Sequence, residues 1–489
     1  MNEKELQIKR DLVLVEEILA NNNEFTCVEF KHNNSDTEMI GKLISALSNA
    51  ARIEQQDFAY VIWGVEDESK NILGTKFDPD TKKVGNQVFI MWLTQKLKPR
   101  LAFSFRKVKH PEGLLVLLEI PAVINTPVEF DKISYVRIGS ATPRLSDFPE
   151  HHKKLIVNLR PYNWEKAIAK SFVTSDEVLK LLDYTSYFKF TNQNLPDNKS
   201  GILERLAGDF LIVKDVGSHW NITNLGAILF AENLDDFGSS VSRKGIRFVS
   251  YDGENKAGTI KQRIDGKRGY ARAFEGIVSY INDLLPVNEH IGQVRRQSML
   301  LFPEIAIREI IANAIIHQDF TISGMGPLVE LFDSRLEVTN PGKSLVKPDR
   351  MIDLPPRSRN EALASLMRRM NFCEEQGTGL DKVVISIEIH QLPPPKFQEN
   401  DDSMRVVLFS PRSFADMSVN ERVRACYQHA IIRYLEGKKL KNKSLCGRFG
   451  IEKKNAAQAT KVINKTLDMN LIKVADPEHP RGGYEPFWA

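Results

Sequence analysis

The stretch PEIAIREIIANAIIHQDF, residues 303–320, decides how the centre of this 489-residue chain folds. Glu309, Asn313 and His317 are four positions apart, which is a drift of only about 40° around an α-helix, so their side chains form one narrow stripe. Isoleucine and alanine cover the remaining surface, and we expect a helix that is buried almost all round. A hydrated metal ion with a polyphosphate would satisfy the buried polar groups; protein groups alone are the structural alternative.

The length and composition indicate a soluble, multidomain α/β protein. A chain of 489 residues exceeds what one core supports, and 42% of its residues are hydrophobic. No run approaches the roughly 18 apolar residues of a membrane helix, and the polar start MNEKELQIKR lacks a secretory segment. We therefore expect a cytoplasmic protein without a membrane partner. The four cysteines are too far apart in sequence for a zinc-type pair or a disulfide framework.

Four domains are expected from the order of helical and strand-like segments. An α/β unit at residues 1–150 contains the buried strand FAYVIWGVED, and a middle domain follows at 160–290. Strands alternate with helices in residues 291–411. Residues 419–489 are predicted to form three helices and a short hairpin, which is the pattern of a winged helix; a small dimerisation or lid domain is the alternative.

Glycine motifs follow the buried helix in a definite order. Asn340 and Gly342 belong to an NPG turn at the end of a predicted hairpin, and Gly377, Thr378 and Gly379 directly precede a predicted helix. Backbone amides approach an anion closely where no Cβ intervenes, and a helix N-terminus adds positive partial charge. The second motif therefore suits a phosphate.

A lid-like segment between these motifs, RSRNEALASLMRRMNF, places Arg359 at the head of a helix, where it could pair with a terminal phosphate. The order of helix stripe, NPG turn, basic helix and GTG resembles the GHKL, or Bergerat-fold, ATPases. It is most similar to the divergent ATP-binding domain found beside Schlafen-like AlbA domains in bacterial proteins. The resemblance implies an α/β-sandwich domain that binds ATP with Mg²⁺.

The same resemblance implies roles for individual residues. Glu309 would orient or deprotonate the attacking water, Asn313 would ligate Mg²⁺, and His317 would extend the stripe toward the nucleotide or the lid. Gly377, Thr378 and Gly379 would hold phosphates. Most of these ATPases have an aspartate where this chain has Asn340, which keeps an acceptor oxygen for the adenine amino group but loses the charge.

Carboxylates also gather near the N-terminus. In NNNEFTCVEFKH, Glu24 and Glu29 precede Lys31, and the strand YVIWGVEDES delivers Asp67. Glu29 and Lys31 would share one strand face, and three carboxylates beside a lysine suit a nuclease that uses Mg²⁺ or Mn²⁺. A structural salt bridge and a solvated acidic loop are the alternatives.

These segments, together with SALSNAA and ILG, resemble the AlbA-type domain of the Schlafen family. The resemblance implies that Glu24, Glu29 and Asp67 match the catalytic triad of Schlafen ribonucleases. Other members of the wider family carry the same glutamates and are taken to bind nucleic acid without cutting it. Arg137 and Arg144 in YVRIGSATPRL would grip a nucleic-acid backbone, or they lie on a plain surface strand.

The C-terminal end is basic. Residues 420–489 hold 14 Lys and Arg against 7 Asp and Glu, a net charge of +7 in a chain whose total is +4. Lys453, Lys454 and Lys461 lie on or before the third predicted helix, which would be a recognition helix for nucleic acid, or a solvated face. A second basic run at residues 256–272 contacts nucleic acid or covers the adjacent sheet.

Two functions follow from these patterns. The first is a protein that binds ATP and nucleic acid, either DNA or RNA such as tRNA, with ATPase and metal-dependent nuclease activity in bacterial antiviral defence or stress response. ATP would order the lid and favour a homodimer or a higher homo-oligomer. The second is a non-enzymatic, ATP-sensing transcription regulator that binds DNA.

Overall fold

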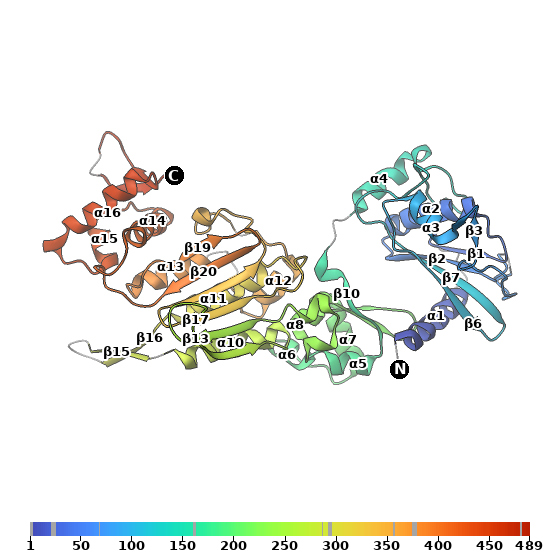
Figure 1. Ribbon diagram of the computed structural model, residues 1–489, viewed down its shortest axis with the longest axis horizontal. Helices are drawn as coiled ribbons and strands as arrows, with labels where there is room; N and C mark the ends of the chain where they lie inside the picture. The colour runs from blue at the N-terminus through green and yellow to red at the C-terminus, as the bar shows by residue number, and fades with distance from the viewer. Residues whose placement is uncertain are drawn as a thin grey trace. The chain divides into compact units, whose positions relative to one another are not determined.

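The computed structural model describes residues 3–20, 26–67, 69–159, 163–285, 287–291, 296–355, 357–373, 379–479 and 482–489. It forms two compact units, Met1–Asn163 with Lys214–Trp220, and Trp164–Val213 with Asn221–Ala489 (Figure 1). Both combine helices with sheets, which confirms the expected multidomain α/β class. None of the helices in the described ranges has the length and apolar character that crossing a bilayer requires.

A four-stranded sheet in the order β1-β2-β7-β6 is the centre of the first unit. Its strands are β1 (Val28–Lys31), β2 (Phe58–Trp63), β7 (Gly113–Pro121) and β6 (Ser104–His110), of which only β1 and β2 run parallel. Val61 and Trp63 pack with helix α2 (Thr37–Ile53), whereas Ile62 packs with helix α1 (Glu3–Ala20). Both faces of β2 are buried, which explains its continuously apolar sequence.

Smaller elements complete this unit. They are α3 (Phe89–Lys96), α4 (Pro149–Asn158), the 3-10 helix η1 (Leu145–Asp147) and the short strands β3 (Lys83–Val84), β4 (Gln87–Val88), β5 (Leu97–Lys98), β8 (Glu129–Phe130) and β9 (Ile133–Ser134). Strands β5, β8 and β9 form their own sheet.

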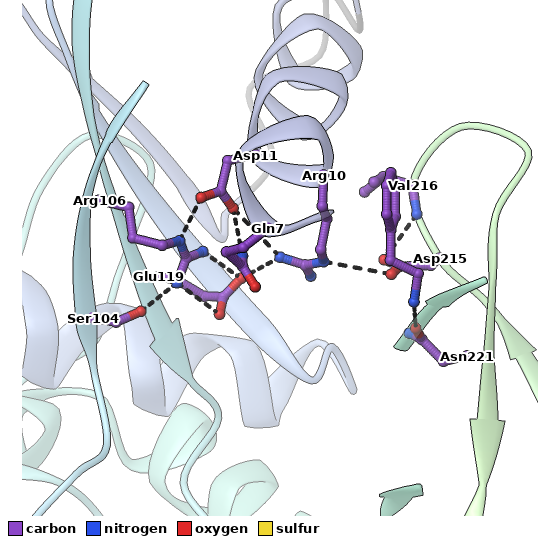
Figure 2. A network of polar contacts seen from close by, with 10 residues as sticks. Gln7, Arg10, Asp11, Ser104, Arg106, Glu119, Asp215, Val216 and Asn221 are labelled. Carbon is purple, nitrogen blue, oxygen red and sulfur yellow. Dashed lines mark hydrogen bonds and ion pairs between the residues drawn. The ribbon is translucent and has the colours of Figure 1, made fainter. Parts of the chain in front are cut away.

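A network of ion pairs holds α1 in the first unit (Figure 2). Arg106 lies 2.7 Å from Asp11 and 3.1 Å from Glu119, and Arg10 lies 3.0 Å from Glu119 and 3.4 Å from Asp215. Burial raises the pKa of the Asp11 carboxyl, and Arg106 opposes this rise. The carboxylates are thus partly removed from water but paired, which is the condition under which buried charge is tolerated.

A six-stranded sheet in the order β14-β13-β17-β18-β20-β19 is the main layer of the second unit. Its strands are β14 (Ile260–Asp265), β13 (Arg247–Tyr251), β17 (Leu328–Phe332), β18 (Arg335–Pro341), β20 (Ser403–Phe409) and β19 (Lys396–Glu399). Only β13 and β17 are parallel. The predicted domain start at residue 291 therefore falls inside this architecture, because β13 pairs with β17 from beyond that residue, and β14 pairs in turn with β13.

Helices α10 (Tyr270–Leu284), α11 (Glu304–Ile316) and α13 (Gly379–Ile389) form the second layer of this α/β sandwich. Helix α11 lies between the other two and contacts β18. Its isoleucine and alanine side chains from Ala306 to Ile316 are buried, as the sequence predicts, whereas Ile305 in the first turn is exposed. The central position of α11 explains why it is apolar on nearly every side.

A smaller sheet and several helices precede this sandwich. The sheet has the order β10-β12-β11, with β10 (Ile168–Val173), β12 (Trp220–Thr223) and β11 (Ile212–Lys214). The helices are η2 (Trp164–Lys166), α5 (Ser175–Leu181), α6 (Tyr184–Phe190), α7 (Lys199–Gly208), α8 (Asn224–Phe230), η3 (Leu234–Asp236) and α9 (Ser239–Ser242). A hairpin of β15 (Val287–Ile291) and β16 (Arg296–Leu300) follows α10.

The C-terminal elements are three helices and a hairpin, close to the predicted bounds. They are α14 (Val419–Leu435), α15 (Asn442–Phe449), η5 (Lys453–Asn455), α16 (Ala457–Asp468), β21 (Ile472–Val474) and β22 (Tyr484–Pro486). Leu440 pairs with Tyr484 and adds a third short strand position. The helices share a core that contains Ala430, Leu445 and Val462.

Candidate functional site

The polar stripe of α11 opens onto a cavity. The amide nitrogen of Asn313 donates to the Glu309 carboxylate at 3.0 Å, which leaves the amide oxygen of Asn313 as an acceptor. His317 caps the end of α11. The cavity is also lined by Asn340, Arg359 and Gly379, and further by Ile310, Ala314, Ile316, Val338, Lys343, Ser344, Leu345, Val346, Met351, Leu354, Arg357, Ser358, Arg368, Cys373, Leu380, Phe397, Met404 and Val406. The structure thus brings together residues that are up to 97 positions apart in sequence, from Glu309 to Val406.

The start of α13 lies against the Glu309 carboxylate. A Cβ at Gly379 would be 1.7 Å from Oε1 of Glu309, so no larger residue fits there without displacing the carboxylate. Gly377 and Thr378, the other members of the predicted phosphate motif, lie outside the described residues. Gly379, the described residue of this motif, therefore allows α13 to approach Glu309 of α11 closely.

The NPG turn closes the cavity beside the end of α11. Asn340 is buried, and its amide nitrogen donates weakly, at 3.3 Å, to the carbonyl of Pro341. Gly342 does not line the cavity, but its φ is +100° and a Cβ there would be 2.7 Å from Cβ of Asp319. Asp319 in turn donates its backbone N–H to Pro341 at 2.8 Å. The positive φ and the close approach to Asp319 explain why glycine occupies position 342.

Arg359 is held at the rim of the cavity. Its guanidinium donates to the carbonyl of His317 at 3.4 Å, and its Nε lies 4.0 Å from the Asp319 carboxylate. The buried Asn360 donates to the carbonyls of Ile316 and Gln318, both at 2.8 Å. These bonds attach the start of α12 (Glu361–Arg369) to the end of α11.

Burial and charge set the ionisation of two groups near the cavity. Burial, with help from the Arg359 cation, lowers the pKa of His317, so this imidazole is neutral near pH 7. Burial and the neighbouring Asp353 raise the pKa of Asp381 to about 6. Asp381 lies in the first turn of α13, and its charge is sensitive to pH near 6.

Several residues in or beside the cavity were not predicted from the sequence. Asp319, which orients Arg359, follows the stripe by two positions and forms a local turn with Thr321, which is a recognisable signal for an ordered loop. Lys343, Arg368 and Cys373 carry no such signal, because only the fold brings them to the cavity.

In the first unit, the Glu29 carboxylate is buried within a cluster of cations. Lys31 lies 2.5 Å from it, and Arg137 makes a second, buried ion pair with it. Glu29 and Lys31 are on the same face of β1, as predicted. Asp67 is exposed in the turn after β2, and Glu24 lies outside the described residues. Among the residues that the structure describes, no three His, Cys, Asp or Glu side chains form a group suited to a metal ion.

The expected phosphate-contacting edge in YVRIGSATPRL is corrected by the structure at one position. Arg137 is buried against Glu29, so its charge is satisfied inside the unit and does not face a nucleic acid. Arg144 is exposed and remains available. The structural salt bridge that the sequence left open is therefore present, extended by a second cation.

The two basic runs differ in their charge pairing. Lys453 and Lys461 are exposed, and Lys454 pairs with Glu452 at 2.6 Å. By contrast, the cations of residues 256–272 are neutralised by ion pairs, mostly with distant segments, which are Lys256–Glu330, Lys261–Asp252, Arg263–Asp265, Lys267–Asp235, Arg268–Glu232 and Arg272–Asp183. Within this run, β14 lies at the edge of the sheet and is exposed at every residue.

Comparison with known families agrees with the fold. Residues 24–146 match the family model described as "Schlafen, AlbA_2", and residues 324–408 match the one described as "Putative ATP-dependent DNA helicase recG C-terminal" (HATPase_c_4). The chain is a Schlafen/AlbA-like protein with an ATPase-like domain, and these domain types associate it with ATP and nucleic acid. The second match includes Asn340, Arg359 and Gly379 but begins after α11.

A solved structure is also similar over the full length. The crystal structure of the DIP2311 protein from Corynebacterium diphtheriae has 16% sequence identity and a TM-score of 0.44, and the likeness covers 98% of this chain and 97% of that one. No curated protein matches the sequence.

Gly379→Ala is expected to weaken nucleotide binding at least about tenfold, or about 1.4 kcal/mol, because the added Cβ displaces the Glu309 carboxylate. Titration calorimetry with ATP and Mg²⁺ measures the effect. Gly276→Ala is the matched control, since a Cβ at this helical glycine meets nothing within 4 Å. An unchanged affinity in Gly379→Ala would show that the cavity does not hold the nucleotide.

Asp381→Asn is expected to stabilise the protein in a pH-dependent manner. The folded-state pKa of about 6 lies above the ordinary 3.8, so Asp381 contributes stability below about pH 4 and loses it as the pH rises to about 6. At pH 7 the ionised Asp381 lowers the free energy of unfolding by about 1 kcal/mol, after allowance for solvent screening of this partly exposed side chain. Thermal unfolding at several pH values should show a gain that grows between pH 4 and 6. The exposed Asp401→Asn is the control, and an equal gain at every pH would contradict the assignment.

Proposed function

We propose that the cavity beside α11 binds ATP with Mg²⁺. The convergence of Glu309, Asn313, Asn340, Arg359 and Gly379 on one cavity is the observation that supports this function most. The sheet contributes apolar side chains to the same cavity, namely Val338, Phe397, Met404 and Val406, and these suit the faces of an adenine ring. Asn340 would accept a hydrogen bond from the adenine amino group.

The polar residues have complementary roles in this proposal. Asn313 would offer its amide oxygen to Mg²⁺, since its nitrogen already donates to Glu309. Glu309 would orient a water for attack on the terminal phosphate, and Arg359 would pair with that phosphate. Gly377 and Thr378 would donate backbone N–H groups to the phosphates, and the neutral His317 would complete the wall. Bound Mg²⁺ would supply charge neutralisation for the phosphate oxygens.

We further propose that the protein binds nucleic acid, with the C-terminal elements acting as a winged helix. The order of three helices and a hairpin in residues 419–489, the net charge of +7 of residues 420–489, and the exposed Lys453 and Lys461 support this. The Schlafen AlbA_2 match supports a second contact in residues 24–146, which would include Arg144. The four-domain division is retained, with the ATP-binding domain beginning at β13.

A metal-dependent nuclease at Glu24, Glu29 and Asp67 is the second candidate. The Lys31 ammonium beside Glu29 supports it, because such a pair suits a scissile phosphate. The buried pair of Glu29 with Arg137 favours binding without cleavage, since a metal would have to compete with two cations for this carboxylate. A role in bacterial antiviral defence or stress response, a cytoplasmic location and a homodimer are proposals that rest on the family resemblance.

Asn313→Ala should reduce the affinity for MgATP at least about tenfold, because one oxygen ligand is lost and Glu309 loses its hydrogen bond. Calorimetry measures it directly. Glu304→Gln is the control, since it changes an exposed carboxylate of the same helix outside the cavity. Equal affinities in wild type and Asn313→Ala would defeat the proposed site.

Incubation with labelled tRNA, single-stranded RNA and DNA duplex in the presence of Mn²⁺ tests whether the protein binds nucleic acid and whether it cleaves it. We expect binding that weakens steeply with salt, because lysines displace counterions from phosphates, and no cleavage. Cleavage that disappears in both Glu29→Ala and Asp67→Ala would instead establish the nuclease. Absence of binding to all three would overturn the nucleic-acid proposal.

A further inference from the structure

Residues 345–354, which we call the bridging segment, form part of the cavity wall. Leu345, Val346, Met351 and Leu354 line the cavity. The segment includes the 3-10 helix η4 (Pro348–Arg350) and leads to the loop that carries Arg359. A nucleotide in the cavity would therefore contact this segment directly.

The same segment packs on the C-terminal helices. The hydroxyl of Tyr427, on α14, donates to the carbonyl of Asp349 at 3.0 Å, and the indole N–H of Trp488 donates to that hydroxyl at 3.2 Å. The guanidinium carbon of Arg350 lies 4.3 Å from the centre of the Trp488 ring, within the range of a cation–π contact. Ile352 is only 6% exposed and belongs to the core of the C-terminal helices.

Neighbouring residues of the bridging segment thus face different environments. Met351 lines the cavity, and Ile352 is packed in the C-terminal core. Phe397 of β19 has the same double position, since it lines the cavity and packs against that core. At Met351 and Ile352 and at Phe397, a single layer of residues separates the cavity from the C-terminal core. Close-packed interiors do not deform freely, so a shift of Met351 on the cavity side moves Ile352 as well.

Helix α13 makes a second connection. Its first residue, Gly379, touches Glu309 in the cavity, and Glu388 near its other end lies 2.9 Å from His429 and 3.5 Å from Arg448. His429 is on α14 and Arg448 is on α15, and both are buried. The C-terminal helices therefore contact both the wall of the cavity and the helix that begins at it.

We infer that the C-terminal helices sense nucleotide occupancy through the bridging segment, so that ATP changes the affinity of these helices for nucleic acid. This inference rests on the proposed ATP site and specifies how binding at that site is transmitted to the C-terminal helices. A ligand shifts an equilibrium only through contacts that differ between two states, and the residues of the bridging segment supply such contacts. By linkage, nucleic acid changes the affinity for ATP by the same factor.

The fluorescence of Trp488 tests the first step without nucleic acid. The full-length protein is titrated with a non-hydrolysable ATP analogue and Mg²⁺, with calorimetry in parallel to record binding. We expect a change in tryptophan emission that is lost in Trp488→Phe, because displacement of Arg350 and Tyr427 alters the surroundings of the indole. Binding of the analogue without any emission change would overturn the inference and leave the ATP site standing.

Anisotropy with a labelled DNA duplex tests the second step. The analogue should change the duplex affinity of the wild type at least about fivefold, and Tyr427→Phe combined with Trp488→Leu should abolish this difference while analogue affinity stays the same. Arg433→Ala is the control, because Arg433 is on α14 but pairs with Glu436. Equal duplex affinity with and without bound analogue would overturn the inference. No binding of the analogue in calorimetry would overturn the proposed ATP function, and the inference with it.

Discussion

The close approach of α13 to the Glu309 carboxylate is the contact on which the rest of the cavity depends. Only a residue without a Cβ permits it, since a Cβ at Gly379 would be 1.7 Å from Oε1 of Glu309. Glu309 in turn accepts the hydrogen bond that orients Asn313. The burial of polar groups on α11 is therefore tolerated because three positions on two helices constrain one another.

This arrangement links the cavity to the C-terminal helices. Helix α13 spans eleven residues, or about 16 Å, and has Gly379 at one end and Glu388 near the other. Glu388 is paired with buried cationic or titratable groups, His429 and Arg448, which would be costly to leave unpaired. The C-terminal helices are therefore connected to the cavity in two ways. One is the set of ion pairs of Glu388, and the other is the direct succession of Met351, which lines the cavity, and Ile352, which packs in the C-terminal core.

In the first unit, the Glu29 carboxylate is already paired with cationic side chains of the same unit. Lys31 and Arg137 surround Glu29, so any metal or phosphate chemistry at this position begins from an existing ion-pair network. A second network, around Arg106, holds α1 against the sheet (Figure 2). In both cases buried charges are matched within the unit, whereas Arg144, Lys453 and Lys461 are exposed.

Periodicity and motif order predicted much of this architecture. The four-residue spacing of Glu309, Asn313 and His317 was sufficient to predict a buried helix with a polar stripe, because helical geometry is local. The apolar run of β2 and the C-terminal helices and hairpin were predictable for the same reason. The domain start at 291 was not, since the pairing of β13 with β17 joins strands that are far apart in sequence.

By itself, the sequence determined which residues share a helix face or a strand face, and hence the candidate stripe and the position of Glu29 and Lys31 on one face of a strand. Only the tertiary structure decided that Arg137 is buried, that the basic run at 256–272 is neutralised, and that Ile352 packs in the C-terminal core. These outcomes depend on contacts between distant segments. A side chain's own sequence neighbours specify its direction, but the group that it meets there is set by how the whole chain packs.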